Sequence, residues 1–196
     1  MAVNLTKGTK LNLEKESATT LKKVRIGLGW DTSAAIGDCD LDVSVFGCKY
    51  NDAGNPKLIG EDYFVFFNNL TCPGGAIRHS GDSLTGAADG DDETIFVDLE
   101  KMPADIEELP IIVTIFQAAS RGHDFGQVKN AYIKLYNDET GEVLGTYNLT
   151  ADYAGFISLQ FGAMFKDADA GNAWAFQAIG VGYNIGLEGF IEEYSA

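Results

Sequence analysis

The sequence predicts an all-β protein, a sandwich of two β-sheets with short peripheral helices and acidic loops. Apolar residues alternate with other residues in many places, as in Val24, Ile26, Leu28 and Trp30, and this period of two is typical of half-buried strands. Residues that favour turns separate the alternating runs, and only two short segments favour a helix. Many short strands with turns between them indicate a sandwich.

The elements follow in chain order from the same signals. Residues 51–55 and 137–141 are rich in Asn, Asp and Gly and predict turns between neighbouring strands. Residues 103–109, which open on a proline, and residues 187–194, whose apolar side chains recur at helical spacing, predict the two short helices. The alternating runs predict strands over residues 24–30, 41–45, 63–67, 95–99, 111–116, 131–135, 157–161 and 174–178.

Composition predicts one folded domain over residues 1–196. A chain of this length can bury a hydrophobic core without disulfide or metal support, and 45% hydrophobic and 22% charged residues are close to the average for globular proteins. The formal net charge is −15, with 29 Asp and Glu against 14 Lys and Arg. This charge repels phosphate backbones, so nucleic acid is excluded as an expected partner.

A cytoplasmic location is expected from the N-terminus and the cysteines. The first residues lack the basic stretch and apolar run of a signal peptide, and no run of apolar residues is long enough to span a membrane. Cys39, Cys48 and Cys72 are odd in number and form no C-x-x-C pair, which favours reduced thiols over a disulfide framework.

The segment from residue 81 to residue 93 predicts a cation site. It carries five acids in thirteen residues and no Lys or Arg, so its carboxylates raise one another's pKa values unless a cation neutralises them. Ca²⁺ prefers six to eight oxygen ligands from carboxylates, carbonyls and water, and flexible Gly-containing loops supply them. The acids of this segment are Asp82, Asp89, Asp91, Asp92 and Glu93.

Two further segments offer oxygen ligands. Asp31, Asp40 and Asp42 lie in a second acidic stretch without basic residues, and the spacing of Asp40 and Asp42 on a strand places both side chains on one face. Asn68 and Asn69 follow a strongly apolar strand and add ligands without charge. Asp, Asn and Gly also collect in surface turns of any acidic protein, and this simpler interpretation competes with a calcium site.

The EF-hand pattern does not explain the acidic segment. Asp89, Asp91, Glu93 and Glu100 fit its ligand spacing, but Thr94 stands where the EF-hand loop requires glycine. The residues that follow alternate as a strand, whereas an EF-hand continues into a helix. His79 and His123 are isolated in the sequence and predict neither a zinc site nor a catalytic triad.

The order of these motifs resembles the TerD family, which is associated with tellurium resistance and stress response. The resemblance extends from about Leu5 to Leu187. It rests on Gly-Trp-Asp at 29–31, Asp-Cys-Asp-Leu-Asp at 38–42, Phe-Phe-Asn-Asn-Leu at 66–70, Gly-Asp-Ser-Leu-Thr-Gly at 81–86 and Asp-Gly-Asp-Asp-Glu at 89–93.

The resemblance implies a two-sheet sandwich, calcium bound by the acidic loops, and a role in resistance to tellurite and other stresses. It does not imply enzymatic activity, and we expect none. Carried over residue by residue, the implied calcium ligands are Asp31, Asp40, Asp42, Asn68, Asn69, Asp82, Asp89, Asp91, Asp92 and Glu93.

Three functions remain open at this point. The leading hypothesis is a calcium-binding module whose loaded loops dock protein partners of a stress-response complex, in the cytoplasm or at the membrane surface. The second is a metal-dependent hydrolase in which the same carboxylates hold Mg²⁺ or Mn²⁺. The third is a structural ion site that orders the loops while partners bind elsewhere on the sandwich.

Overall fold

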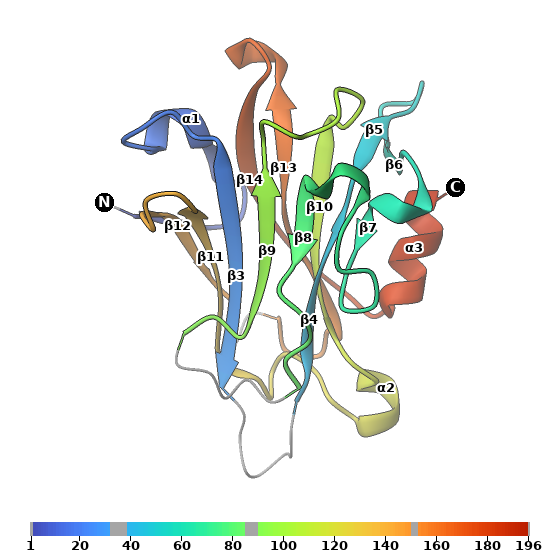
Figure 1. The fold of residues 1–196 in the computed structure, drawn as a ribbon. Helices are drawn as coiled ribbons and strands as arrows, with labels where there is room; N and C mark the ends of the chain where they lie inside the picture. The colour runs from blue at the N-terminus through green and yellow to red at the C-terminus, as the bar shows by residue number, and fades with distance from the viewer. Residues whose placement is uncertain (1, 32–38, 85–89, 150–152, 196) are drawn as a thin grey trace.

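A computed structural model describes residues 2–31, 39–84, 90–149 and 153–195, whose strands form two sheets packed face to face (Figure 1). Sheet A has the strand order β1 (Val3–Asn4), β12 (Val143–Asn148), β11 (Lys129–Asn137), β3 (Lys23–Asp31), β9 (Glu93–Asp98) and β8 (Ile77–His79). Sheet B has the order β2 (Lys10–Asn12), β14 (Ala173–Tyr183), β13 (Ser158–Asp167), β10 (Glu108–Ile115), β4 (Leu41–Phe46) and β7 (Phe64–Val65). In addition, β5 (Cys48–Tyr50) pairs with β10 and with β6 (Pro56–Leu58). The predicted all-β sandwich is confirmed.

The main core lies between the sheets and is built from the alternating side chains of the strands. Ile26 and Leu28 of β3 and Leu41, Val43 and Val45 of β4 are all completely buried in one apolar cluster. Because successive side chains of a strand point to opposite faces, the residues between them face outward. The core therefore decides which acidic side chains point away from it.

A second apolar cluster covers the outer face of sheet B. The helix α3 (Leu187–Ser195) places Phe190 and Tyr194 against Phe46 of β4 and Ile112 of β10. Figure 1 shows α3 beside the strands β6 and β7, on the side of the molecule away from β3. The helix predicted over residues 187–194 is confirmed.

The other predicted helix is wrong. Residues 103–105 form only a turn, in which the Ile106 amide donates to the Pro103 carbonyl at 3.1 Å, and β10 begins at Glu108. Ile106 and Leu109 are completely buried, so tertiary packing and pairing with β13 and β4 prevail over the local helix signal. Short helices within the described ranges also include α1 (Leu13–Glu16), η1 (Glu61–Tyr63), η2 (Pro73–Gly75), α2 (Ala118–Arg121) and η4 (Ala168–Ala170).

The strand predicted over residues 63–67 is shorter in the structure. Only Phe64–Val65 pairs with β4, and the chain then reverses in a tight turn in which Phe66 and Asn69 exchange two backbone hydrogen bonds of 3.1 and 3.0 Å. The turns at residues 51–55 and 137–141 join β5 to β6 and β11 to β12, as predicted. No helix among the described residues has the length and apolarity that crossing a membrane requires.

Three strands meet at one end of the sandwich. The strand β3 ends there, and β4 and β9 begin there, at the lower end of the molecule in Figure 1. The acidic residues lie at or beside these strand ends, so the fold gathers segments that are far apart in the sequence. This end of the sandwich contains the candidate site.

Candidate metal site

Three carboxylates come together beside the start of β4. One carboxylate oxygen from each of Asp40, Asp42 and Asp82 lies within 4.8 Å of the others. Asp40 and Asp42 are buried, with exposed fractions of 5% and 3%, whereas Asp82 is exposed. We call these three residues the acidic group.

The strand alternation places Asp42 in this group. Its neighbours Leu41 and Val43 belong to the main core, so Asp42 points to the outer face of sheet B, opposite Thr114 in the pairing with β10. The Phe116 amide donates to the Asp40 carbonyl at 2.9 Å and fixes the backbone just before the strand. The Trp30 indole donates to the Cys39 carbonyl at 2.9 Å and ties the same backbone to the end of β3.

The acidic group is electrostatically strained when all its members are ionised. Burial, reinforced by Asp82 and Glu93, raises the pKa of Asp40 to about 6. Burial, reinforced by Glu93 and then by Asp40 and Asp82, raises the pKa of Asp42 to about 8. A bound cation would remove this repulsion because each carboxylate would then face a positive charge.

One oxygen of the group has no hydrogen-bond partner in the described ranges. Asp40 Oδ1 is buried and makes no hydrogen bond with the described part of the chain, although buried oxygens are normally paired. The donors that converge here are all carboxylate oxygens, which is the ligand type that a hard divalent cation prefers. The residues present therefore offer ligands that suit a hard divalent cation, a class that includes Ca²⁺.

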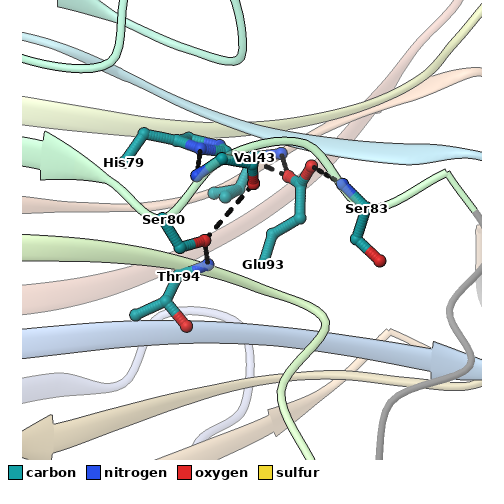
Figure 2. A network of polar contacts seen from close by, with 7 residues as sticks. Val43, His79, Ser80, Ser83, Glu93 and Thr94 are labelled. Atoms are coloured by element: carbon teal, nitrogen blue, oxygen red, sulfur yellow. Dashed lines mark hydrogen bonds and ion pairs between the residues drawn. The ribbon is translucent and has the colours of Figure 1, made fainter.

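Glu93 is close enough to the acidic group to raise the pKa values of Asp40 and Asp42. Figure 2 shows its contacts with Val43 and Ser83, through which it connects the two sheets. It is completely buried at the start of β9. Its Oε2 accepts a hydrogen bond of 2.8 Å from the Val43 amide of sheet B, and its Oε1 accepts one of 3.3 Å from the Ser83 amide. Because Ser83 directly follows Asp82, Glu93 also positions the backbone that carries the third carboxylate.

His79 approaches Glu93 from β8. Its Nε2 lies 3.5 Å from Glu93 Oε2, and both side chains are completely buried. The His79 Nδ1 accepts a hydrogen bond of 3.0 Å from the Gly81 amide, which holds the ring against the segment after β8. The neighbouring Thr94 and Ser80 exchange two hydrogen bonds that hold β9 to the segment after β8, namely Thr94 amide to Ser80 Oγ and Ser80 amide to Thr94 carbonyl.

Asp91 is not brought into the acidic group. Its Oδ1 accepts hydrogen bonds from the hydroxyls of Tyr132 at 3.1 Å and Tyr136 at 3.0 Å. Its carboxylate lies directly over Gly27, in the space that a Cβ at this position would occupy. Gly27 alternates with the buried Ile26 and Leu28 of β3, so Asp91 lies on the outer face of sheet A.

Asp92 and Asp31 also have protein partners of their own. Asp92 Oδ2 accepts a hydrogen bond of 3.0 Å from the Trp30 amide, which extends the pairing at the end of β3. Asp31, the exposed last residue of β3, accepts a hydrogen bond of 2.6 Å from the Asn130 amide group. Both lie at the same end of the sandwich as the acidic group, without belonging to its three residues.

The two predicted asparagine ligands, Asn68 and Asn69, have different surroundings. Asn69 is half-buried, and its Nδ2 donates to the carbonyls of Phe64 at 2.7 Å and Asp62 at 3.3 Å, so its amide group stabilises the turn after β7. Asn68 is exposed. Asp89, the remaining residue of the implied ligand set, lies outside the described residues.

Two kinds of residue near the site were not predicted from the sequence. Arg121 of α2 is close enough to lower the pKa of Asp40, against the larger effects that raise it. Tyr132 and Tyr136 bind Asp91, and burial followed by the Asp91 charge raises the pKa of Tyr132 to about 12. A signal for the tyrosines was present in Gly27 and Gly29, because glycines inside a strand often mark the close approach of another group.

The geometry therefore defines a class: a β-sandwich protein with a group of converging carboxylates at one end. A family model described as the TerD domain matches residues 1–194. The chain is 38% identical to "Tellurium resistance protein TerD" of Alcaligenes sp over 195 residues, which cover 99% of this chain and 97% of that protein. It is 40% identical to "General stress protein 16U" of Bacillus subtilis (strain 168) over 196 residues, with 99% and 97% covered.

A solved structure shares the fold. The crystal structure of a homologue of telluride resistance protein (TerD) from Streptomyces coelicolor A3(2) superposes with a TM-score of 0.71 at 25% identity, covering 90% of this chain and 99% of that one. The chain belongs to the TerD family, the family of tellurium-resistance and stress-response proteins. The resemblance inferred from the motifs is confirmed.

Proposed function

We propose that this protein is a calcium-binding module without enzymatic activity that serves in a stress-response complex. The observation that carries the proposal is the acidic group, in which Asp40, Asp42 and Asp82 converge and Asp40 Oδ1 is buried without a hydrogen-bond partner among the described residues. An ion at this place would bind Asp40 and Asp42 from one segment and Asp82 from another. It would therefore tie the segment after β8 to the start of β4.

Calcium is favoured over magnesium by the segments that carry the carboxylates, because both ions prefer oxygen ligands. Mg²⁺ demands a tight octahedron and loses water reluctantly, whereas Ca²⁺ accepts variable numbers of oxygens from flexible segments. Asp82 comes from a partly exposed segment that contains Gly81, and Asp40 and Asp42 come from a buried strand end. Such a combination can adjust to the larger ion, and we propose that ligands from the other acidic residues complete its shell.

The proposed partners are proteins, and the charge of the molecule supports a regulated contact. With a net charge of −15, the ion-free protein repels acidic surfaces, while a bound cation reduces the local repulsion at the end of the sandwich. Binding of partners would then depend on calcium. We propose that this contact occurs in the cytoplasm, including at the membrane surface.

A calorimetric titration with Ca²⁺ and Mg²⁺ tests the ion site directly. We expect Ca²⁺ to bind clearly more tightly than Mg²⁺, and the Asp42→Asn variant to lose most of this affinity. Asp52→Asn is a matched control, because Asp52 lies in the exposed turn between β5 and β6. Equal affinities for the two ions, or tight binding of Mg²⁺ or Mn²⁺ together with hydrolysis of phosphate esters or peptides, would instead favour the hydrolase hypothesis.

A further inference from the structure

A pocket adjoins the acidic group on the outer side of sheet B. It has a volume of about 520 Å³ and lies between α2 and the start of α3. Asp42 belongs both to the acidic group and to the lining of this pocket. A ligand in the pocket would therefore lie beside the proposed calcium ion.

The pocket has an aromatic wall. Phe67 and Phe116 both line it and are half-buried, and their rings meet edge to face with centroids 6.2 Å apart. The Arg121 guanidinium lies 5.5 Å from the centre of the Phe116 ring and helps to hold it. Ile157 and Leu187 also contribute to the lining, so the pocket offers apolar surface to the flat face of a ring.

Polar groups from several elements line the same pocket. Thr114, Gln117, Ser120 and Glu188 are all part of its surface. Gln117 has a left-handed backbone with φ of 52°, a conformation that costs energy for residues other than glycine and is enriched at functional sites. The combination of apolar walls with dispersed polar groups is typical of a site for a small polar ligand.

The charge of the site favours a neutral small-molecule ligand over an anionic one. The three carboxylates of the acidic group, when ionised, exceed the charge of one Ca²⁺, and Arg121 is the basic residue whose charge acts on Asp40. An anionic ligand would add repulsion to a site that is already balanced or negative. Neutral hydroxyl oxygens can replace water on the ion without this cost, because Ca²⁺ accepts neutral oxygens as well as carboxylates.

We propose that the pocket binds a saccharide in the presence of calcium, an inference that rests on the calcium site proposed above. Its hydroxyls supply oxygen ligands to the ion held at Asp42, and the apolar face of its ring packs against Phe67 and Phe116. Hydroxyls on the rest of the ring meet the polar groups of Gln117 and Ser120. An entirely apolar ligand would remove water from these exposed polar groups without replacing its hydrogen bonds, which disfavours binding.

The test uses the full chain on an array of immobilised glycans, with Ca²⁺ or with EDTA. We expect binding to at least one class of glycan with Ca²⁺ and its loss in EDTA. The variant Ala119→Leu fills the pocket from the exposed side of α2 and should weaken glycan binding by about tenfold or more while the calorimetric affinity for Ca²⁺ stays unchanged. Ala53→Leu, an equal change in the exposed turn between β5 and β6, should bind like the parent.

Three results would overturn the saccharide inference while leaving the calcium site intact. They are normal calcium binding without any bound glycan, glycan binding that persists in EDTA, and an Ala119→Leu variant that binds glycans as the parent does. Failure of calcium to bind in the calorimeter overturns the proposed function itself, and the saccharide inference with it. The calorimetric measurement therefore distinguishes the two failures.

Discussion

At the scale of single residues, the acidic group differs from ordinary surface turns in the cost of its charges. Asp40 and Asp42 are buried, and burial together with neighbouring carboxylates raises their pKa values, whereas a solvated turn residue pays no such cost. The sign of the change in ion-free stability on mutation distinguishes a strained carboxylate from a solvated turn residue. Neutralising a strained carboxylate should stabilise the ion-free protein and weaken the loaded one.

The Asp40→Asn variant tests this sign. Without calcium we expect the free energy of unfolding at pH 8 to increase by on the order of 1 kcal/mol, because one of the mutually repelling charges is gone. With calcium we expect the affinity to fall by about 100-fold or more, since even changes around a metal's ligands cost 10–100-fold. Urea unfolding in EDTA and calorimetry with Ca²⁺ measure the two effects.

Asp91→Asn is the matched comparison. Asp91 accepts hydrogen bonds from Tyr132 and Tyr136 on the outer face of sheet A, and an asparagine oxygen can still accept them. We expect a smaller loss of calcium affinity than for Asp40→Asn and no gain in ion-free stability. An equal loss in both variants would place Asp91 among the calcium ligands, as the family resemblance implies.

The raised pKa values also predict how stability depends on pH. Below the ordinary aspartate pKa of 3.8, the folded and unfolded chains both hold the protons of Asp40 and Asp42. As the pH rises toward about 6 and about 8, the unfolded chain has lost these protons while the folded one retains them. These two groups therefore make the ion-free protein progressively less stable between about pH 4 and about pH 8.

Unfolding experiments in EDTA across this pH range check the prediction. The charged groups that act on Asp40 and Asp42 from other segments are Glu93, Asp82 and Arg121. All three groups are retained in the variant Asp42→Asn, which removes only the titration of Asp42. In that variant the loss of stability between pH 6 and pH 8 should be clearly smaller than in the parent. An identical slope in both proteins would contradict a raised pKa of Asp42.

At the scale of the elements, β3 shows why two of its outward positions are glycine. Gly27 lies under the Asp91 carboxylate, and Gly29 lies under the Tyr132 ring, and a Cβ at either position would collide with the group above it. A side chain there would displace the groups that hold the segment before β9 onto sheet A. Glycine has a low propensity for strands, but at these two positions it allows Asp91 and Tyr132 to approach the backbone of β3 closely.

Gly27→Ala should consequently destabilise the protein by about 1–3 kcal/mol, the usual cost of overpacking. Its expected cause is the clash with the Asp91 side chain, so the double variant Gly27→Ala with Asp91→Ala should lose less stability than the sum of the two single variants. Gly60→Ala is the control, because its nearest contact would be an ordinary 3.7 Å. Simple additivity of the two changes would rule out the clash.

Features that depend on alternation along a strand could be predicted from the sequence, whereas a segment whose structure depends on long-range pairing could not. The alternation of Val24, Ile26 and Leu28 predicted β3 because a half-buried strand must repeat every two residues. Asp40 and Asp42 were predicted on one face for the same reason. The helix predicted at residues 103–109 was wrong because local propensity competes with long-range pairing, which no short window contains.

The close partners of the site lay beyond sequence reasoning for a related cause. Arg121 comes near Asp40 only through the path of the chain after β10. Asp82 and Asp42 do converge, but the family resemblance placed them in one ligand set, whereas periodicity did not. The Glu93 contact with Val43 likewise joins residues 50 positions apart in the chain. Periodicity predicts the face of a strand, but it does not predict which strand lies opposite.

At the scale of the whole molecule, the sandwich and the acidic group draw on separate sources of stability. The main core joins completely buried side chains of both sheets, such as Ile26, Ile95, Val113 and Phe161, and a chain of this size buries most of its surface without a metal. The acidic group, in contrast, lies at one end of the sandwich and adds repulsion when it is ion-free. Calcium should therefore act on an already folded protein.

Removing calcium should lower the melting temperature without unfolding the sheets. An ion present at about 100 times its dissociation constant and bound only by the folded state adds about 2.7 kcal/mol, which corresponds to roughly 5–10 °C for a protein of this size. Far-ultraviolet circular dichroism in EDTA at about 25 °C should keep its β signal, while hydrogen exchange of the amides near Asp82 should speed up because local order is lost before the core opens. The Asp40→Asn variant should show almost no calcium-dependent shift in melting temperature. Collapse of the β signal in EDTA would mean that the ion is required for the fold itself, and an unchanged melting temperature in the parent would contradict a calcium site in the folded state.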